Sequence, residues 1–152
     1  MATYRVYTDG SVDETQTGSG SAFVAFTNKS FLSNGYHYYT GSNSAHAETL
    51  AIGLACDSIL DNEELTLTKE DTVVFYVDCM SALNYMKAQL ASNNPVNGKP
   101  VLRNAVNKLR QLNEITTVSL RKTKAHKSVF DSNIYVDALA KYAARSRECM
   151  LL

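Results

Sequence analysis

The pattern of apolar and polar residues predicts three β-strands near the start of the chain. Apolar residues alternate with polar ones, or form short runs, over Thr3–Asp9, Ser21–Thr27 and Phe31–Thr40. A polar turn rich in Gly and Thr covers Asp13–Gly20, and the pair Asn28-Lys29 forms a tight hairpin turn. Because short turns join successive strands, we expect the three strands to be antiparallel.

An apolar helix is predicted over Ser44–Leu60. Its apolar residues follow helical spacing, and Ser44 is of a residue type preferred at a helix N-cap. Between Ala47 and Cys56 the only charged residue is Glu48. A helix that is apolar on nearly all sides is a buried helix, so Glu48 interrupts a segment that we expect inside the protein.

The rest of the chain alternates between strands and helices after an acidic connector, Asp57–Asp71. In chain order the pattern predicts a buried strand over Thr72–Val77, a helix over Cys79–Leu90, a helix from Pro100 onward, a strand over Thr116–Lys122 and a helix over Asn133–Arg147. The order βββαβααβα predicts a mixed sheet with helices packed on it. By its length we expect the chain to form a single domain over residues 1–152.

Composition is typical of a soluble globular protein, with 45% hydrophobic and 20% charged residues. No apolar stretch approaches the roughly 18 residues of a membrane span, so we expect no membrane contact. The N-terminus enters a strand pattern directly, so we expect no signal peptide. The three cysteines, Cys56, Cys79 and Cys149, show no metal-ligand spacing, and the first two are expected to be small core residues. We therefore expect a reducing, cytoplasmic setting, and we expect a monomer.

Charge is divided unevenly along the chain. Residues 1–98 contain 4 Lys or Arg against 11 Asp or Glu, a balance of −7, whereas residues 99–147 contain 11 against 3, a balance of +8. Glu148 brings the total to zero. This division predicts a basic side that faces a polyanion, although charge alone leaves solvated helix faces as an alternative.

Four carboxylates stand in apolar surroundings, where a folded protein disfavours charge. Two lie at the ends of predicted strands and two lie on apolar helical segments, so all four could meet at one edge of the sheet. We call them the acidic quartet: Asp9, Glu48, Asp78 and Asp137. Any one alone is best explained as an end-of-element residue facing water. Four in one short chain instead favour a common site for a hard divalent cation with oxygen ligands.

The quartet and the residues around it resemble ribonuclease H of type 1 over essentially the whole chain. The matching segments are Tyr7–Ser11, Ala47–Ala51, Val77-Asp78, and Asn133 followed four residues later by Asp137–Ala140. The resemblance implies an α/β fold with an RNase H-like mixed five-stranded sheet, in which three antiparallel strands precede parallel strands and helices cover both faces. It also implies endonucleolytic hydrolysis of the RNA strand of RNA–DNA hybrids, leaving 5′-phosphate and 3′-hydroxyl ends.

The same resemblance assigns roles to individual residues. It implies that the quartet binds two Mg²⁺ ions, with Mn²⁺ as a possible substitute, which activate a water molecule and stabilise the leaving oxygen. His126 matches the family's loop histidine, whose imidazole can move protons or assist product release. The residues expected to contact the hybrid are Gly10, Ser11, Asn43, Ser44, His46, Lys122, Lys124 and Asn133.

Several positions depart from the family pattern. Many members carry two asparagines that read 2′-hydroxyls, where this chain has Ser44 and Ala45. A common glutamine is replaced by Met80, and the usual Gly before the loop histidine by Ala125. The chain contains no Trp, so the Trp-containing basic handle of some relatives is not evident. These departures leave the quartet intact but remove side chains that would bond the hybrid.

Two other functions stay open. One is a nuclease of the same fold that acts on another nucleic acid, like a DNA-junction resolvase or an exonuclease. The other is a hybrid-binding module without turnover. The intact quartet argues against the second alternative, because a binding module has no need of four mutually repelling carboxylates.

Overall fold

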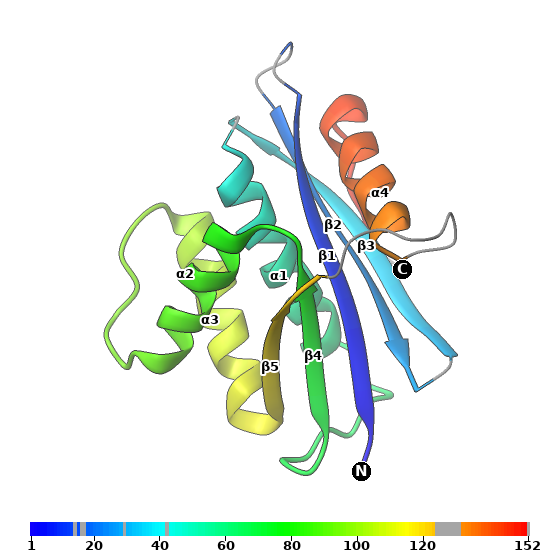
Figure 1. Cartoon of the computed structure of the whole chain (residues 1–152), viewed down its shortest axis with the longest axis vertical. Helices are drawn as coiled ribbons and strands as arrows, with labels where there is room; N and C mark the ends of the chain where they lie inside the picture. The colour runs from blue at the N-terminus through cyan, green and yellow to red at the C-terminus, as the bar shows by residue number, and fades with distance from the viewer. Residues whose placement is uncertain (14, 16–17, 29, 42, 124–131, 152) are drawn as a thin grey trace.

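A mixed β-sheet forms the centre of the protein (Figure 1). The computed structural model describes residues 1–152 apart from 14, 16–17, 29, 42, 124–131 and 152. Within these described residues the sheet has the order β5-β4-β1-β2-β3-β6. The strands are β1 (Thr3–Asp13), β2 (Gly18–Thr27), β3 (Ser30–Thr40), β4 (Thr72–Val77), β5 (Thr117–Lys122) and β6 (Met150–Leu151).

The strand directions confirm the predicted mixed sheet. β1 pairs with β2, and β2 with β3, in antiparallel orientation, whereas β4 pairs in parallel with both β1 and β5. The additional strand β6 pairs with Gly35 and Tyr36 at the edge of β3. It was not predicted, because two residues are too few to show an alternating pattern.

Helices cover both faces of the sheet, as the resemblance implied (Figure 1). On one face lie α1 (Ser44–Leu60), α2 (Met80–Ala91) and α3 (Pro100–Ile115), and on the other lies α4 (Ser132–Ser146). Pro100 is the first residue of α3, as predicted from its fixed φ angle. None of the described helices combines the length and the apolar character that a membrane span requires.

Apolar side chains fill the space between the sheet and the helices. Val6, Phe75 and Leu109 are fully buried in the core shared with α1, α2 and α3, and Val136 of α4 is buried in a second core on the other face of the sheet. Cys56 is also buried in the larger core, as predicted, whereas Cys79 is only half-buried. Burying a large apolar side chain contributes roughly 1.5–3 kcal/mol. These cores therefore hold the two helices of the quartet, α1 and α4, against opposite faces of one sheet.

The structure corrects the predicted end of the first strand and the predicted N-cap of α1. β1 continues beyond Asp9 to Asp13, because its pairing with β2 extends to Asp13↔Gly18 and replaces part of the predicted turn. The N-cap of α1 is Asn43 rather than Ser44. The Asn43 side-chain oxygen accepts a hydrogen bond from the backbone N–H of His46 at 3.0 Å, which satisfies one of the free donors at the helix start.

Candidate active site

Asp9 and Asp78 occupy neighbouring positions where two parallel strands stop pairing. The register between β1 and β4 ends at Thr8↔Val77, so Asp9 and Asp78 are the next residue on each strand. Asp9 stays within β1 because it pairs with Ala22 of β2. Two carboxylates that are distant in the sequence thus lie on neighbouring strands, at the point where the parallel pairing of β1 and β4 ends.

Glu48 reaches Asp9 because α1 lies directly on β1 at Gly10. A Cβ atom at Gly10 would lie 2.5 Å from both the carbonyl carbon of Ala47 and the nitrogen of Glu48, so only glycine fits. Ser21 of β2 forms a second tie, since its hydroxyl donates to the carbonyl oxygen of Ala47 at 2.6 Å. These two contacts fix the first turn of α1 on the sheet, with Glu48 facing Asp9.

Asp137 reaches the same place from the opposite face of the sheet. α4 lies on β2 at Gly20, where an added Cβ atom would lie 2.1 Å from the carbonyl oxygen of Ala140 and 2.5 Å from the nitrogen of Ala144. This close approach positions the turn of α4 that carries Asp137. The Asp137 carboxyl group then interacts directly with that of Asp9.

Burial controls the protonation of the two inner carboxyl groups. Asp9 is 9% exposed and Glu48 is 7% exposed. Burial raises the pKa of Asp9 to about 6. Burial, followed by the neighbouring Asp9 carboxylate, raises the pKa of Glu48 to about 10. The N–H of Gly10 donates to Asp9 Oδ1 at 2.9 Å and favours its ionised form. At neutral pH Glu48 therefore carries a proton while Asp9 is largely charged.

The two outer carboxyl groups are paired with lysines instead. The side chains of Asp78 and Asp137 are 57% and 39% exposed. Lys122 Nζ lies 2.9 Å from Asp78 Oδ1, and Lys141 Nζ lies 2.9 Å from Asp137 Oδ2 one helical turn away. Exposed ion pairs contribute about 0–1 kcal/mol each. These lysines therefore neutralise and orient the outer carboxylates without contributing much to folding.

The donor set of the quartet fits a hard divalent cation. Glu48 Oε2 is buried and has no hydrogen-bond partner, which is costly unless something positive contacts it. Carboxylate oxygens are the ligands that Mg²⁺ and Mn²⁺ prefer. Among the described residues, no three His, Cys, Asp or Glu side chains already form a metal-binding group. In this arrangement a proton on Glu48 and lysines beside Asp78 and Asp137 reduce the negative charge of the quartet.

The predicted contact residues are distributed unevenly around the quartet. His126 and Lys124 lie outside the described residues, so their roles stay predictions. Gly10 and Ser11 directly follow Asp9 in β1, and the Gly10 N–H is already engaged by the Asp9 carboxylate. Asn133 is buried in α4, so a direct contact between its side chain and a nucleic acid requires local rearrangement.

Asn43 and His46 line a cavity of about 350 Å³ between the start of α1, the end of β3 and the start of α3. Lys99 lines the same cavity from the α3 side, and Ser44 is exposed at the first position of α1. The structure thus places three of the predicted contact residues at the start of α1, the helix that carries Glu48. Lys99, which our sequence analysis did not assign to the site, supplies the positive charge of this group.

Sequence reasoning missed two residues that hold the quartet. Lys141 lies four residues after Asp137 on the same helix, a spacing that predicts an ion pair, so a signal was present in the sequence. Ser21 gave no such signal, because a serine in an alternating strand is ordinary. Its contact with Ala47 joins elements 26 residues apart and is visible only in the folded chain.

Comparison with known proteins identifies relatives of this chain. The profile of the RNase H family matches residues 1–145. LC9-RNase H1, a type 1 RNase H with the type 2 active-site motif, superposes with a TM-score of 0.70 at 14% identity, over 100% of this chain and 77% of its own. No curated protein matches the chain.

Two further solved structures share the fold. RNase H1 from the halophilic archaeon Halobacterium salinarum NRC-1 superposes with a TM-score of 0.64 at 17% identity, over 96% of this chain and 99% of its own. The protease–reverse transcriptase of prototype foamy virus superposes with a TM-score of 0.68 at 21% identity, over 95% of this chain but only 21% of its own. At these identities the structural matches establish the fold alone.

Proposed function

The chain belongs to the RNase H family, and on that premise we propose that it is an endonuclease that hydrolyses the RNA strand of RNA–DNA hybrids. The products are a 5′-phosphate and a 3′-hydroxyl end. One observation supports the proposal: the carboxyl group of Asp9 in β1 interacts with those of Glu48 in α1 and Asp137 in α4, and Asp78 directly follows the strand that pairs with β1.

The proposal assigns the acidic quartet to two Mg²⁺ ions, with Mn²⁺ as a substitute. Bound Mg²⁺ would supply positive charge for the attacking and departing oxygens of the phosphodiester. The chain's own contribution is to hold four carboxylates on rigid elements that approach each other at Gly10 and Gly20. Loading the site must also remove the proton that burial places on Glu48.

Selection of the RNA strand is proposed to depend on the residues at the start of α1. The 2′-hydroxyl is the group that distinguishes RNA from DNA at a given position. The oxygen of Asn43 caps α1, which leaves its NH₂ group as a donor, and Ser44 presents an exposed hydroxyl. Ala45 offers only its backbone, and Met80 is 50% exposed without a polar group, so we expect fewer bonds to the hybrid than amide side chains would provide.

Cleavage of three labelled duplexes in Mg²⁺ tests the proposed function. We expect cutting of RNA in RNA–DNA, no cutting of DNA–DNA or RNA–RNA, and complete inhibition by EDTA. Equal cutting of DNA–DNA would favour a nuclease that acts on another substrate. Tight binding of the hybrid without cutting in Mg²⁺ or Mn²⁺ would favour a binding module. Either result contradicts the proposal.

A further inference from the structure

Lys122 contacts Asp78 in two ways. The β4–β5 register pairs Val77 with Lys122, so this lysine lies beside the residue that precedes Asp78. Its ammonium group donates to the Asp78 carboxylate at 2.9 Å and also to the Asp78 backbone carbonyl. Two acceptors on one residue hold the ammonium over the first position after β4, whereas most surface lysines move freely in solvent.

Lys141 forms an ion pair with the other exposed carboxylate, that of Asp137. It lies one helical turn after Asp137 and contacts its Oδ2 at 2.9 Å. Neither Asp9 nor Glu48 forms an ion pair with a lysine or arginine among the described residues. The two cations therefore contact only the exposed half of the quartet, which a metal arriving from solvent meets first.

We infer that Lys122 and Lys141 are resident counter-ions that compete with divalent metal for the exposed carboxylates. Each ammonium group occupies a carboxylate oxygen that a metal would use, so loading the site requires its displacement. Each also leaves a positive charge near the incoming cation, which lowers the affinity further. This inference rests on the proposed function only in taking the quartet as the metal site.

The competition has a predictable size. Exposed ion pairs are weak, so removing one lysine should raise the affinity for Mg²⁺ about threefold, and removing both about tenfold. Lys122 should have the larger effect, because it forms two contacts while Lys141 forms one. Replacement of Lys122 by arginine keeps the charge and should leave the affinity close to that of the wild type.

Calorimetric titration with Mg²⁺, in the absence of nucleic acid, tests this inference. The variants are Lys122→Met, Lys141→Met, the double variant and Lys122→Arg. Lys108→Met is the matched control, because Lys108 forms a partly exposed pair with Asp57 at 3.1 Å between α3 and α1. We expect tighter binding in the methionine variants at Lys122 and Lys141, and wild-type affinity in the control. A thermal melt of each variant verifies that it is folded.

The titration separates failure of this inference from failure of the proposed function. Asp78→Asn should weaken Mg²⁺ binding strongly if the quartet is the metal site. Wild-type affinity in Asp78→Asn would remove the basis of both proposals. Weakened binding in Asp78→Asn, together with unchanged or weaker binding in the double lysine variant, would overturn the counter-ion role alone.

Discussion

At the scale of single residues, the chain stabilises four carboxylates by two different means. The buried pair, Asp9 and Glu48, retains a proton because desolvation raises both pKa values. The exposed pair, Asp78 and Asp137, is neutralised by lysines. The four carboxylates can therefore remain close together without metal, because Glu48 is protonated and two of the others are paired with lysines.

Asparagine substitutions in the quartet should separate activity from folding. Asp9→Asn and Asp78→Asn each keep the side-chain shape but lose the anionic ligand, so we expect each to remove nearly all cleavage of the hybrid. Asp57→Asn is the control, because Asp57 is an aspartate of α1 that pairs with Lys108 away from the quartet. Hydrolysis of labelled hybrid in Mg²⁺ measures the effect. Full activity in Asp9→Asn or Asp78→Asn would mean that the quartet is not the active site.

The raised pKa values also predict how stability depends on pH without metal. Asp9 rises from 3.8 to about 6 and Glu48 from 4.5 to about 10. The stability that these protonated groups contribute is complete below the unfolded-state values and is lost as pH rises through the folded-state values. We therefore expect their contribution to the unfolding free energy to decrease from pH 5 to pH 9.

Urea denaturation in EDTA measures this dependence, and Glu48→Gln should flatten it because the amide does not titrate. Asp71 has the opposite effect on the pH dependence of stability, because backbone hydrogen bonds from Thr68 and Ala2 lower its pKa. Its contribution is lost only as pH falls through its lowered value, so measurements above pH 5 avoid it. If the unfolding free energy depended on pH equally in Glu48→Gln and in the wild type, the result would contradict the protonation of Glu48.

At the scale of elements, the site depends on how closely two helices approach the sheet. Glycine at positions 10 and 20 allows α1 and α4 to touch the backbones of β1 and β2. The hydroxyl of Ser21 then ties β2 to the first turn of α1. A small displacement of either helix would move a carboxylate relative to the other three, and misplacement of about 1 Å is enough to reduce catalysis greatly.

Ser21→Ala should therefore lower activity more than its effect on stability explains. Loss of one buried hydroxyl-to-carbonyl bond costs about 1 kcal/mol. Thr116→Val is the matched control, because the Thr116 hydroxyl donates to the Asp71 carbonyl at 2.9 Å in a buried place away from the quartet. We expect similar losses of stability in urea denaturation, but reduced turnover only in Ser21→Ala. Equal activities would show that Ser21 does not position α1.

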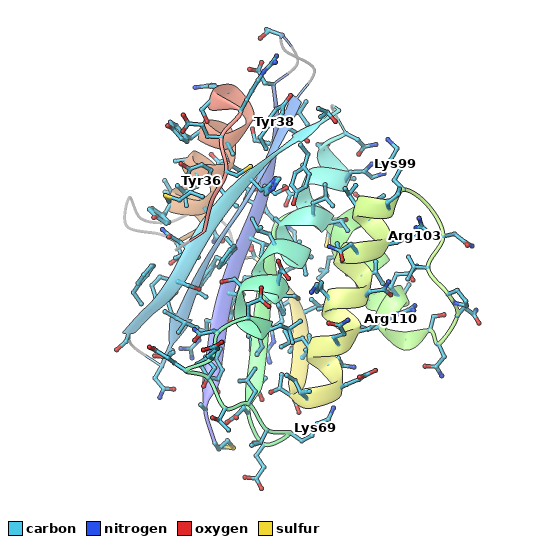
Figure 2. The ribbon with its side chains drawn as sticks, turned by 180° about the vertical axis from the view of Figure 1, so that it is seen from behind. Tyr36, Tyr38, Lys69, Lys99, Arg103 and Arg110 are labelled. Carbon is cyan, nitrogen blue, oxygen red and sulfur yellow. The ribbon has the colours of Figure 1, made fainter. Side chains whose placement is uncertain are left out.

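At the scale of the whole molecule, basic side chains lie at both ends of the structure, but only one end adjoins the start of α1. Figure 2 shows Lys99 and Arg103 near the start of α3, and Lys69 at the opposite end of the molecule. The Lys69 ammonium group donates a hydrogen bond to the backbone carbonyl of Asn113, so it already has a partner within the protein. Lys99 lines the same cavity as Asn43 and His46, so we expect the start of α3 to neutralise phosphates of a bound nucleic acid.

Charge reversal should locate this contact. Lys99→Glu combined with Arg103→Glu should weaken hybrid binding about tenfold near 0.1 M salt and reduce the salt slope by about 0.9 for each lost phosphate contact. Lys69→Glu at the far end should leave both quantities unchanged. Fluorescence anisotropy in Ca²⁺ between 50 and 300 mM salt provides the measurement. Equal salt slopes of binding in the double variant and the wild type would indicate that the nucleic acid binds another surface.

The sequence alone predicted the helices and all the described strands except β6, and it singled out the four carboxylates of the quartet. Periodicity is a local property, so it located the helix over Ser44–Leu60, the buried strand over Thr72–Val77 and the start of α3 at Pro100. A charged residue inside an apolar segment can also be recognised from the local sequence, because burial of an unpaired carboxylate is unfavourable in any fold. These two signals, with the resemblance to ribonuclease H, were sufficient to predict the mixed sheet.

Only the tertiary structure decided how the quartet is assembled and neutralised. The register Thr8↔Val77 makes Asp9 and Asp78 neighbours, the helix approaches at Gly10 and Gly20 add Glu48 and Asp137, and none of these contacts has a local pattern. The same holds for the pairing of Lys122 with Asp78, since its partners lie 44 residues apart. Strand register, close backbone approach and burial all depend on elements that are distant in the sequence, and the chain specifies them only when its whole core packs.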